Sequence, residues 1–409
     1  MTDTKPHRPI PLYLKIIAAL ILGVGAGLLL PVAWSEALDI PAKLILRLLG
    51  AIAPPLILLA VMRALIVANA RGKLAGKMCF LLALNTLVAI LIGLTVANLI
   101  QPGRHASLPP GDAPKVSGNP LTQMLDNVPS SLIRPLVENN AIGVILIAVA
   151  FGLAARKLRP HLKEQLLSAL EIGFDLILMV LHWVIALVPL AVFCKVGFVV
   201  GTQGFKPFYA LGWFIIAVLV ALTLQGLYYL ARIRIATWVR PFNLINGTRD
   251  ALAMAFSTAS STATMPVTYA CLREKVGLRE ESASLGALVG SNFNNDGTAL
   301  YEAMAALFIA QMVGTNLSLE SQIMVVLTSI VASVGAAGIP EAGLVTMTLV
   351  FSAVHLPTGY IALLLPVDWF LDRCRTTVNV MGDMNVSCIL DGKKRESETP
   401  DPFLKGLTE

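Results

Sequence analysis

The chain has 409 residues, of which 56% are hydrophobic and only 14% are charged. Soluble globular domains of this size do not usually show this balance, so the composition indicates a membrane protein. The formal charge of +6 does not indicate nucleic-acid binding, because the basic residues stand in short loops between apolar runs. The five cysteines are scattered and form no CxxC pair, which gives neither a disulfide framework nor a cysteine metal site.

Six apolar runs occupy the first 240 residues, and most are long enough to cross a hydrocarbon core of about 30 Å. We expect spans near residues 11–31, 43–69, 77–100, 140–156, 165–200 and 208–232. Lys5 and Arg8 precede the first run as in a secretion signal, but the run is longer than a signal core, so it is read as a retained span. The Pro/Gly-rich residues 101–119 predict an exposed loop, followed by a broken helix to about residue 138.

The basic residues of the loops predict the orientation of the chain. If the amino terminus is cytoplasmic, the loops on the inner side hold Arg71, Lys73, Lys77, Arg156, Lys157, Arg159, Lys163, Arg232, Arg234 and Arg240. The loops on the outer side contain few Lys or Arg residues, which is the asymmetry that the positive-inside rule describes. We therefore expect a multi-pass protein of the cell inner (plasma) membrane with both termini in the cytoplasm.

After residue 240 the apolar stretches are interrupted at their centres. Residues 245–272 and 322–357 each carry small and polar residues and a proline between apolar arms, so each predicts a re-entrant hairpin that stops inside the membrane. The spans that follow are polar at their centres, around residues 294–298 and 372–383, and we expect both to be broken. Two units of hairpin and broken span are typical of an inverted repeat whose interrupted helices surround a substrate site.

The last span carries a polar seam of six residues. They are Asp368, Asp372, Arg375, Thr376, Asn379 and Asp383. Their spacing confines them to a stripe about 100° wide on one helix face. Ionisable groups at membrane depth indicate a functional site, although an Asp/Arg pair can also serve only to hold helices together. An acidic amino acid fits the mixture: Asp372 would bind its ammonium, Asn379 and Ser261 its α-carboxylate, and Arg375 its side-chain carboxylate.

Residues 292–298 combine a carboxylate, several amides and a glycine within one span. Unwound carbonyls and carboxylate oxygens at this density suit a small hard cation. The alternative is a glycine-kinked helix with polar packing, and the spacing does not name the ion. An enzyme is not expected: no GxSxG elbow or nearby histidine accompanies the serines of residues 257–261. Met-Gly-Asp at 381–383 resembles a motif of intramembrane aspartyl proteases, but a catalytic pair of aspartates would not require Arg375 on the same helix face.

Four segments resemble the dicarboxylate/amino-acid:cation symporter family, which includes the excitatory amino-acid transporters and archaeal aspartate transporters. They are SSTATMPVT (260–268), NNDGTALYEAMAALFIAQ (294–311), GAAGIPEAGLVTM (335–347) and DWFLDRCRTTVNVMGD (368–383). The resemblance covers residues 241–391 nearly without gaps, and the first six spans more loosely. It implies secondary active uptake of glutamate or aspartate with sodium, and with protons as an open possibility. No cofactor is implied beyond the co-transported ions.

The resemblance also implies an architecture. The fold class is an all-α polytopic membrane protein with eight transmembrane helices, two re-entrant helical hairpins, inverted repeats and an elevator motion within a homotrimer in lipid. Residues 1–240 would be mainly scaffold, 241–391 the transport core and 392–409 a cytoplasmic tail. The span near 77–100 and part of 165–200 would pack with the core.

Residue roles follow from position in the matching motifs. The substrate residues are Ser260, Ser261, Thr298, Gly338, Ile339, Asp372, Arg375, Thr376 and Asn379. The cation residues are Thr86, Gly290, Asn292, Asn294, Asn295, Asp296, Ser333, Val334, Ala336, Asn379 and Asp383, with Asn85 beside Thr86. Among them Asp383, Asp296 and Asn294 are the expected sodium ligands, and Glu302 resembles the proton carrier of the excitatory transporters.

Three positions depart from the family pattern. Asn295 replaces a methionine whose sulfur approaches the ions, Leu82 replaces a tyrosine near the third ion, and Glu341 adds a titratable group at the tip of the second hairpin. Sodium coupling, proton coupling and potassium counter-transport therefore stay open. The nearest alternative is a proton-coupled carrier for C4-dicarboxylates, which have no ammonium for Asp372 to bind. A ligand-gated channel or a membrane receptor is the alternative from another class.

Overall fold

The computed structural model describes residues 12–67, 73–106, 129–138, 140–335 and 342–395. These residues are mostly helical and form no β-strand. The α-helices are α1 (Leu12–Leu29), α2 (Val32–Ala37), α3 (Asp39–Val67), α4 (Lys73–Ile100), α6 (Arg134–Val137), α7 (Ala141–Ala155), α8 (Pro160–Ile185), α9 (Val188–Gln203), α10 (Lys206–Ala236), α11 (Pro241–Thr258), α12 (Ser261–Ala270), α13 (Glu280–Ala283), α14 (Asp296–Met312), α15 (Leu319–Gly335), α16 (Ala342–Ala353) and α17 (Leu365–Asp391). Short 3-10 turns cover Pro102–His105, Gly290–Asn292 and Thr358–Leu363, and π-helical turns cover Cys271–Val276 and Ser284–Val289.

The helices are those of a multi-pass membrane protein. Within the described residues, three segments are long and apolar enough to cross a membrane, namely Gly76–His105, Pro160–Ile185 and Lys206–Ala236. Large apolar side chains such as Leu29, Ile172 and Trp183 are exposed on the outer helix faces. In water such faces would be costly, whereas lipid tails cover them without penalty. The all-α membrane class is therefore confirmed, while the count of eight spans stays a prediction.

The expectation of one span at 165–200 is wrong, because two helices cover it. Helix α8 ends at Ile185 and α9 begins at Val188, with Pro189 as its second residue. Proline has no N–H to donate, and its ring clashes with the carbonyl four residues earlier, here that of Ile185. The apolar pattern runs through the break without change, so hydropathy alone did not reveal it.

Only one of the two expected broken spans is broken. The first unwinds between the 3-10 turn Gly290–Asn292 and the start of α14 at Asp296. The second is the continuous helix α17, Leu365–Asp391, so the expectation of a break at residues 372–383 is wrong. The polar side chains of α17 bond to neighbouring elements, and its backbone hydrogen bonds continue without interruption. The first span is interrupted at Asn294 and Asn295, and asparagine is a poor helix former.

The first predicted hairpin is present. Helices α11 and α12 pack against each other and meet at a tight turn, where Ala259 has a φ of 51° and Ser260 caps α12. The cap is the side-chain oxygen of Ser260, which accepts a hydrogen bond of 3.1 Å from the N–H of Ala263. In the second hairpin α15 and α16 also pack together. Its tip, residues 336–341, lies outside the described residues.

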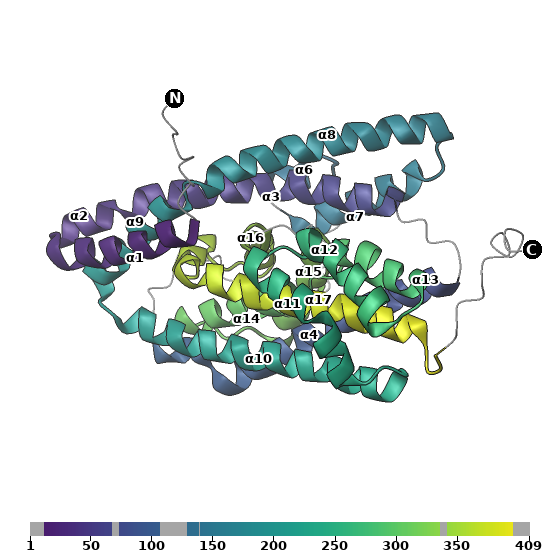
Figure 1. Ribbon diagram of the computed structural model, residues 1–409. Helices are drawn as coiled ribbons and strands as arrows, with labels where there is room; N and C mark the ends of the chain where they lie inside the picture. Colours follow the sequence, from purple (N-terminus) through teal and green to yellow (C-terminus); the bar gives the residue numbers. More distant parts are fainter. Residues whose placement is uncertain (1–11, 68–72, 107–128, 139, 336–341, 396–409) are drawn as a thin grey trace, which may run out of the picture.

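The helices pack in two sets. Helix α3 contacts α7, α8 and α9, and α1 and α2 pack on α9. Helix α14 contacts α4, α15 and α17, and α10 packs on α4 and α17. Figure 1 shows α8 along one long side of the molecule, α10 along the opposite side and α17 between them. Between the sets, α3 contacts α15 and α16, and α9 contacts the turn Thr358–Leu363. Helix α10 precedes the expected boundary at residue 240 and yet packs with α4 and α17.

Candidate functional site

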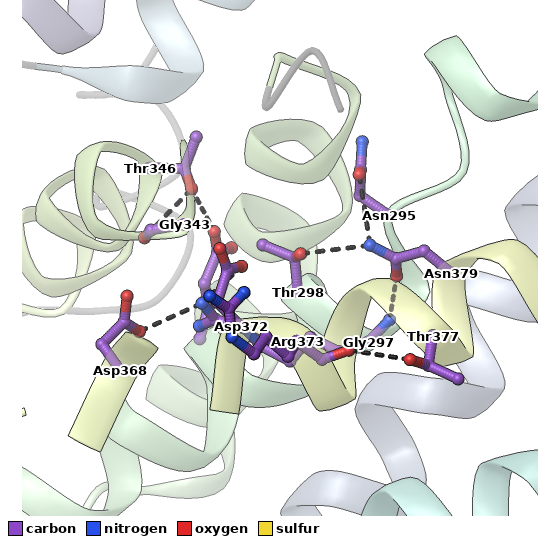
Figure 2. Close-up of polar contacts among 12 residues, drawn as sticks. Asn295, Gly297, Thr298, Gly343, Thr346, Asp368, Asp372, Arg373, Thr377 and Asn379 are labelled. Carbon is purple, nitrogen blue, oxygen red and sulfur yellow. Dashed lines mark hydrogen bonds and ion pairs between the residues drawn. The ribbon is translucent and has the colours of Figure 1, made fainter. Parts of the chain in front are cut away.

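The polar seam of α17 faces the protein interior. All six of its residues are buried, and Arg375 has no exposed surface. The Nη2 atom of Arg375 lies 2.9 Å from Asp372 Oδ1 and 3.0 Å from Asp368 Oδ1. The guanidinium carbon also lies 4.1 Å from the centre of the Tyr301 ring, within the range of a cation–π contact. Figure 2 labels Asp368 and Asp372, and a dashed line marks the ion pair of Asp368. One cation therefore faces two carboxylates and an aromatic ring.

Two nitrogens of the guanidinium are unused. Among the described residues, Nε and Nη1 of Arg375 are buried and have no hydrogen-bond partner. Gly343, near the start of α16, borders this side: a Cβ there would lie 3.3 Å from Nη1 and 3.3 Å from Thr298 Cγ2. A buried guanidinium with unsatisfied donors is costly, and a carboxylate can satisfy two of them at once. The face of Arg375 toward Thr298 and Gly343 is therefore suited to an anionic ligand group.

Asn379 connects α17 with the start of α14. Its Oδ1 accepts a hydrogen bond of 2.8 Å from the N–H of Gly297, and its Nδ2 lies 3.4 Å from Asn295 Oδ1 and 3.5 Å from Thr298 Oγ1 (Figure 2). A Cβ at Gly297 would come within 2.7 Å of the Arg375 carbonyl oxygen, so glycine permits this close approach. The side chains of Asn379, Thr298 and Arg375 are thereby held around one location.

Other expected substrate residues lie farther out or cannot be placed. Ser261 is buried, and its hydroxyl lies 3.4 Å from the carbonyl oxygen of Ser291, so it contacts the broken span. Thr376 is buried beside Arg375 on α17. The hydroxyl of Ser260 is used as the helix cap described above. Gly338 and Ile339 lie outside the described residues.

Polar groups from the broken span gather around Asp383. Asn294 donates from Nδ2 to Asp383 Oδ1 at 3.0 Å and to the carbonyl of Asn379 at 2.8 Å. The Oδ1 atom of Asn294 is buried and has no partner among the described residues. A Cβ at Gly290 would lie 3.6 Å from Asp383 Oδ1, so the Gly290 turn adjoins the carboxylate. An orphaned amide oxygen beside a buried carboxylate is chemically suited to a small hard cation.

A second expected cation position is altered by Asn295. The Nδ2 atom of Asn295 donates to the carbonyl oxygen of Ser333 at 2.8 Å. That carbonyl was expected to face an ion, and here it already accepts a hydrogen bond from the residue that replaces the family's methionine. Asn292 and Val334 lie in described helical turns, but their side chains are not described, and Ala336 lies outside the described residues.

Asp296, the first residue of α14, is completely buried. The hydroxyl of Thr86 donates to Asp296 Oδ1 at 2.6 Å, and the hydroxyl of Tyr229 donates to Oδ2. Next to Thr86, the side-chain oxygen of Asn85 accepts a hydrogen bond from Arg232. The structure thus brings Thr86, Asn85 and Asp296 together as expected, with two residues of α10 added.

Glu302 lies two turns into α14 and has no exposed surface. Its Oε1 accepts a hydrogen bond from the hydroxyl of Thr346 on α16, and its Oε2 has no partner among the described residues. A carboxyl group in this position joins α14 to the second hairpin. Burial of this kind is the setting in which a carboxyl can carry a proton.

Sequence reasoning missed Tyr229, Arg232 and Tyr301, and gave Asp368 no role. Arg232 was counted as a loop charge, but it belongs to helix α10 and reaches Asn85 across the interior. Its position three residues after a tyrosine was an available signal, since residues at i and i+3 share a helix face. For Tyr301 and Asp368 the sequence held no such signal, because their contacts with Arg375 depend on how the helices pack.

Comparison with known proteins identifies relatives along nearly the whole chain. The family model described as the sodium:dicarboxylate symporter family matches residues 12–393. Excitatory amino acid transporter 2 of Mus musculus is 39% identical over 269 residues, covering 64% of this chain and 46% of the relative. Excitatory amino acid transporter 3 of Oryctolagus cuniculus is 29% identical over 460 residues, covering 95% and 87%. Neutral amino acid transporter B(0) of Homo sapiens is 30% identical over 431 residues, covering 94% and 79%. The match to excitatory amino acid transporter 2 thus spans less than half of that protein's length.

Proposed function

The chain belongs to the sodium:dicarboxylate symporter family, and from this membership and the site geometry we propose that it is a secondary active symporter for glutamate or aspartate. The observation that carries the substrate class is the guanidinium of Arg375, buried with Nε and Nη1 unpaired among the described residues. A substrate carboxylate would accept hydrogen bonds from both nitrogens in a bidentate arrangement. Among the relatives are both excitatory and neutral amino acid transporters, and Arg375 favours an acidic substrate.

The remaining polar groups match the rest of an amino acid. Asp372 is the partner for the ammonium group, and it is held 2.9 Å from Arg375 before substrate enters. Asn379 and Thr298 are the partners for the α-carboxylate, together with Ser260, Ser261, Thr376 and the hairpin backbone at Gly338 and Ile339. Binding of a zwitterion would exchange the internal ion pair for two substrate ion pairs. Substrate charge then replaces protein charge without leaving a buried group unpaired.

Cations accompany the substrate in this proposal. Asp383, Asn294 and the carbonyls of Gly290 and Asn379 would hold sodium, since they combine a carboxylate with an amide oxygen that has no partner in the described part of the chain. The second position, at the backbone of Asn292, Ser333, Val334 and Ala336, is weakened by the hydrogen bond from Asn295 to Ser333. Glu302 would carry a proton, since its carboxyl is buried against Thr346 of the moving hairpin. Sodium is cargo in this scheme, and no other cofactor takes part.

The two packing sets support an elevator transporter. The set α1, α2, α3, α7, α8 and α9 would form the fixed scaffold of a homotrimer, and α4 with α10 to α17 would form the mobile transport core. This division keeps α4 with the core, as expected for the span near 77–100, and adds α10 from the first 240 residues, because both pack on α14 and α17. The protein would lie in the inner membrane with both termini cytoplasmic, as the loop charges indicate.

Uptake into proteoliposomes tests the proposal. Labelled L-aspartate, L-glutamate and succinate are offered with an inward sodium gradient, an inward proton gradient or neither. We expect the amino acids to accumulate with the sodium gradient. Accumulation of succinate alone with a proton gradient would establish the C4-dicarboxylate alternative, against which Asp372 argues because a dicarboxylate offers it no ammonium. If no gradient drives accumulation of any of the three, symport is refuted and a channel or receptor takes its place.

A further inference from the structure

Asp296 is a buried carboxylate without a directly bound cation. It has no exposed surface, and no Lys, Arg or His nitrogen lies within 4.0 Å of it among the described residues. Its two hydrogen bonds come from neutral hydroxyls, those of Thr86 and Tyr229. A carboxylate in such a place is costly unless a positive charge lies nearby. In a symporter, that charge can be a transported cation or a residue of the protein.

Arg232 supplies a positive charge at this location. It lies one helical turn after Tyr229 on α10, so both side chains leave the same face of the helix. Its Nη1 donates to Asn85 Oδ1, and Asn85 is the neighbour of Thr86. Since Thr86 donates to Asp296, the consecutive residues Asn85 and Thr86 link the guanidinium to the carboxylate. Tyr228 fixes the guanidinium, since its hydroxyl lies 3.1 Å from Nη1 and its ring centre 5.3 Å from the guanidinium carbon.

The polar groups around Asp296 are oriented for a fixed network rather than for a metal ion. A bound cation needs oxygen lone pairs that converge on it. Here the side-chain oxygen of Asn85 is already used by Arg232, and both carboxylate oxygens of Asp296 accept hydroxyl hydrogens. Leu82, one turn before Thr86 on α4, has no side-chain oxygen.

The helix of the polar seam closes the remaining side. A Cβ at Gly382 would come within 3.1 Å of Asp296 Oδ2, 3.0 Å of the Tyr229 hydroxyl and 2.4 Å of Asn294 Nδ2. The backbone of α17 therefore lies directly against Asp296, and even a methyl group has no room there. An ion beside Asp296 would therefore have to lie on the opposite side, toward Asn85, where the guanidinium of Arg232 stands.

We propose that the guanidinium of Arg232 is a tethered cation that replaces a transported cation beside Asp296, so that each transport cycle binds one cation fewer at this place. The inference rests on the proposed symport function, whose cation stoichiometry it specifies. A tethered charge stays with the helix through the cycle, whereas a bound sodium must enter and leave. The residues Asn85, Thr86 and Tyr229 then serve to hold Arg232 and Asp296 in register.

Thermal unfolding of the purified, detergent-solubilised protein tests the proposal without transport. The unfolding midpoint is measured against sodium concentration, with choline chloride keeping the ionic strength constant and L-aspartate present throughout. The slope of the midpoint against the logarithm of sodium concentration reports how many ions bind the folded protein. In Arg232→Gln, Asp296 loses its cation and sodium can take the place, so we expect a slope roughly 1.5- to 2-fold steeper than in the wild type, one ion being added to one or two.

Three further variants make the result specific. Arg232→Lys keeps the charge and should keep the wild-type slope. The double variant Arg232→Gln with Asp296→Asn removes both charges and should also return to the wild-type slope. Arg234→Gln removes an exposed arginine of the same helix and should change nothing.

The outcomes separate the inference from the proposed function. A folded Arg232→Gln variant with the wild-type slope overturns the tethered cation. If that variant does not fold, recovery of folding in the double variant supports the charge pairing, and failure to recover overturns it. A wild-type protein whose midpoint does not depend on sodium while L-aspartate is present instead refutes the symport function on which the inference rests.

Discussion

Replacing Arg375 by methionine should remove affinity for acidic amino acids more than for neutral ones. Within the described part of the chain, Nε and Nη1 of the guanidinium are unpaired, and in the proposed site they receive the substrate carboxylate. Hydrogen bonds to charged groups contribute about 1.5–3 kcal/mol each, so their joint loss amounts to about 3–6 kcal/mol. At 1.4 kcal/mol for each factor of ten, the dissociation constant of aspartate rises by roughly 100-fold to 10,000-fold.

The same substitution also disturbs the fold, and the design has to separate the two effects. Without Arg375, the carboxylates of Asp368 and Asp372 lose the cation that lies within 3.0 Å of both. Removing one partner of a buried pair costs about 3–5 kcal/mol of stability. The change is therefore made in an Asp368→Asn background, which removes one of the two carboxylates. Arg373→Met, on the same helix but half-buried against Trp369, is the matched control.

Competition binding gives the readout once thermal unfolding has shown that each variant is folded. Labelled aspartate is displaced by aspartate and by alanine, which shares the ammonium and α-carboxylate but lacks the side-chain carboxylate. We expect the preference for aspartate over alanine to fall by roughly 100-fold or more relative to the Asp368→Asn parent. A folded variant that keeps aspartate affinity within about threefold of that parent refutes the role given to Arg375.

Three further substitutions test other parts of the site. Glu302→Gln mimics the protonated carboxyl and should abolish the response of uptake to a proton gradient while aspartate still binds; unchanged proton coupling in proteoliposomes would remove Glu302 from this role. Asn295→Met frees the Ser333 carbonyl from its 2.8 Å hydrogen bond and should strengthen sodium binding by roughly 2- to 10-fold in a sodium titration of aspartate binding; weaker sodium binding would contradict it. Gly297→Ala forces a Cβ to within 2.7 Å of the Arg375 carbonyl and should lower the thermal midpoint by an overpacking cost of about 1–3 kcal/mol, whereas Gly212→Ala, with no atom within 4 Å, should not; equal midpoints would contradict the close packing of α14 on α17.

The polar seam of α17 was predictable because helix geometry fixes which residues share a face. Spacings of three and four residues place Asp372, Arg375 and Asn379 on one stripe whatever the rest of the fold does. The apolar residues between them then require that stripe to face inward in a membrane. The break before α14 was predictable for a similar local reason, since Asn-rich sequence with Gly297 does not favour a continuous helix.

The break between α8 and α9 was not predictable in the same way. Pro189 interrupts the ladder at Ile185, but Pro54 and Pro55 lie inside α3 and that helix continues from Asp39 to Val67. Proline alone therefore does not decide whether a membrane helix ends, because neighbouring groups can satisfy the freed backbone. The outcome depends on packing that sequence reasoning does not supply.

The network around Arg232 was out of reach for a different reason. Its partner Asn85 lies 147 residues earlier in the chain, and Asp296 lies farther along it. From composition, an arginine near the end of a span counts toward topology, and nothing local separates an inward-facing arginine from one at the surface. Only the packing of α10 against α4 brings the guanidinium to the interior.

The break before α14 lies between the proposed substrate and cation sites, and the residues on its two sides have different partners. Before the break, Asn294 donates hydrogen bonds to both Asp383 and the carbonyl of Asn379. A cation bound at Asp383 would therefore affect the position of Asn379 through Asn294. After the break, Asp296 is held by fixed hydroxyls with Arg232 as the nearby charge. If sodium binds at Asp383 and Arg232 replaces a cation at Asp296, as proposed, only the position before the break exchanges an ion during transport. Since coupling between two ligands is reciprocal, a sodium ion that orders Asn379 for substrate must itself be bound more tightly when substrate is present.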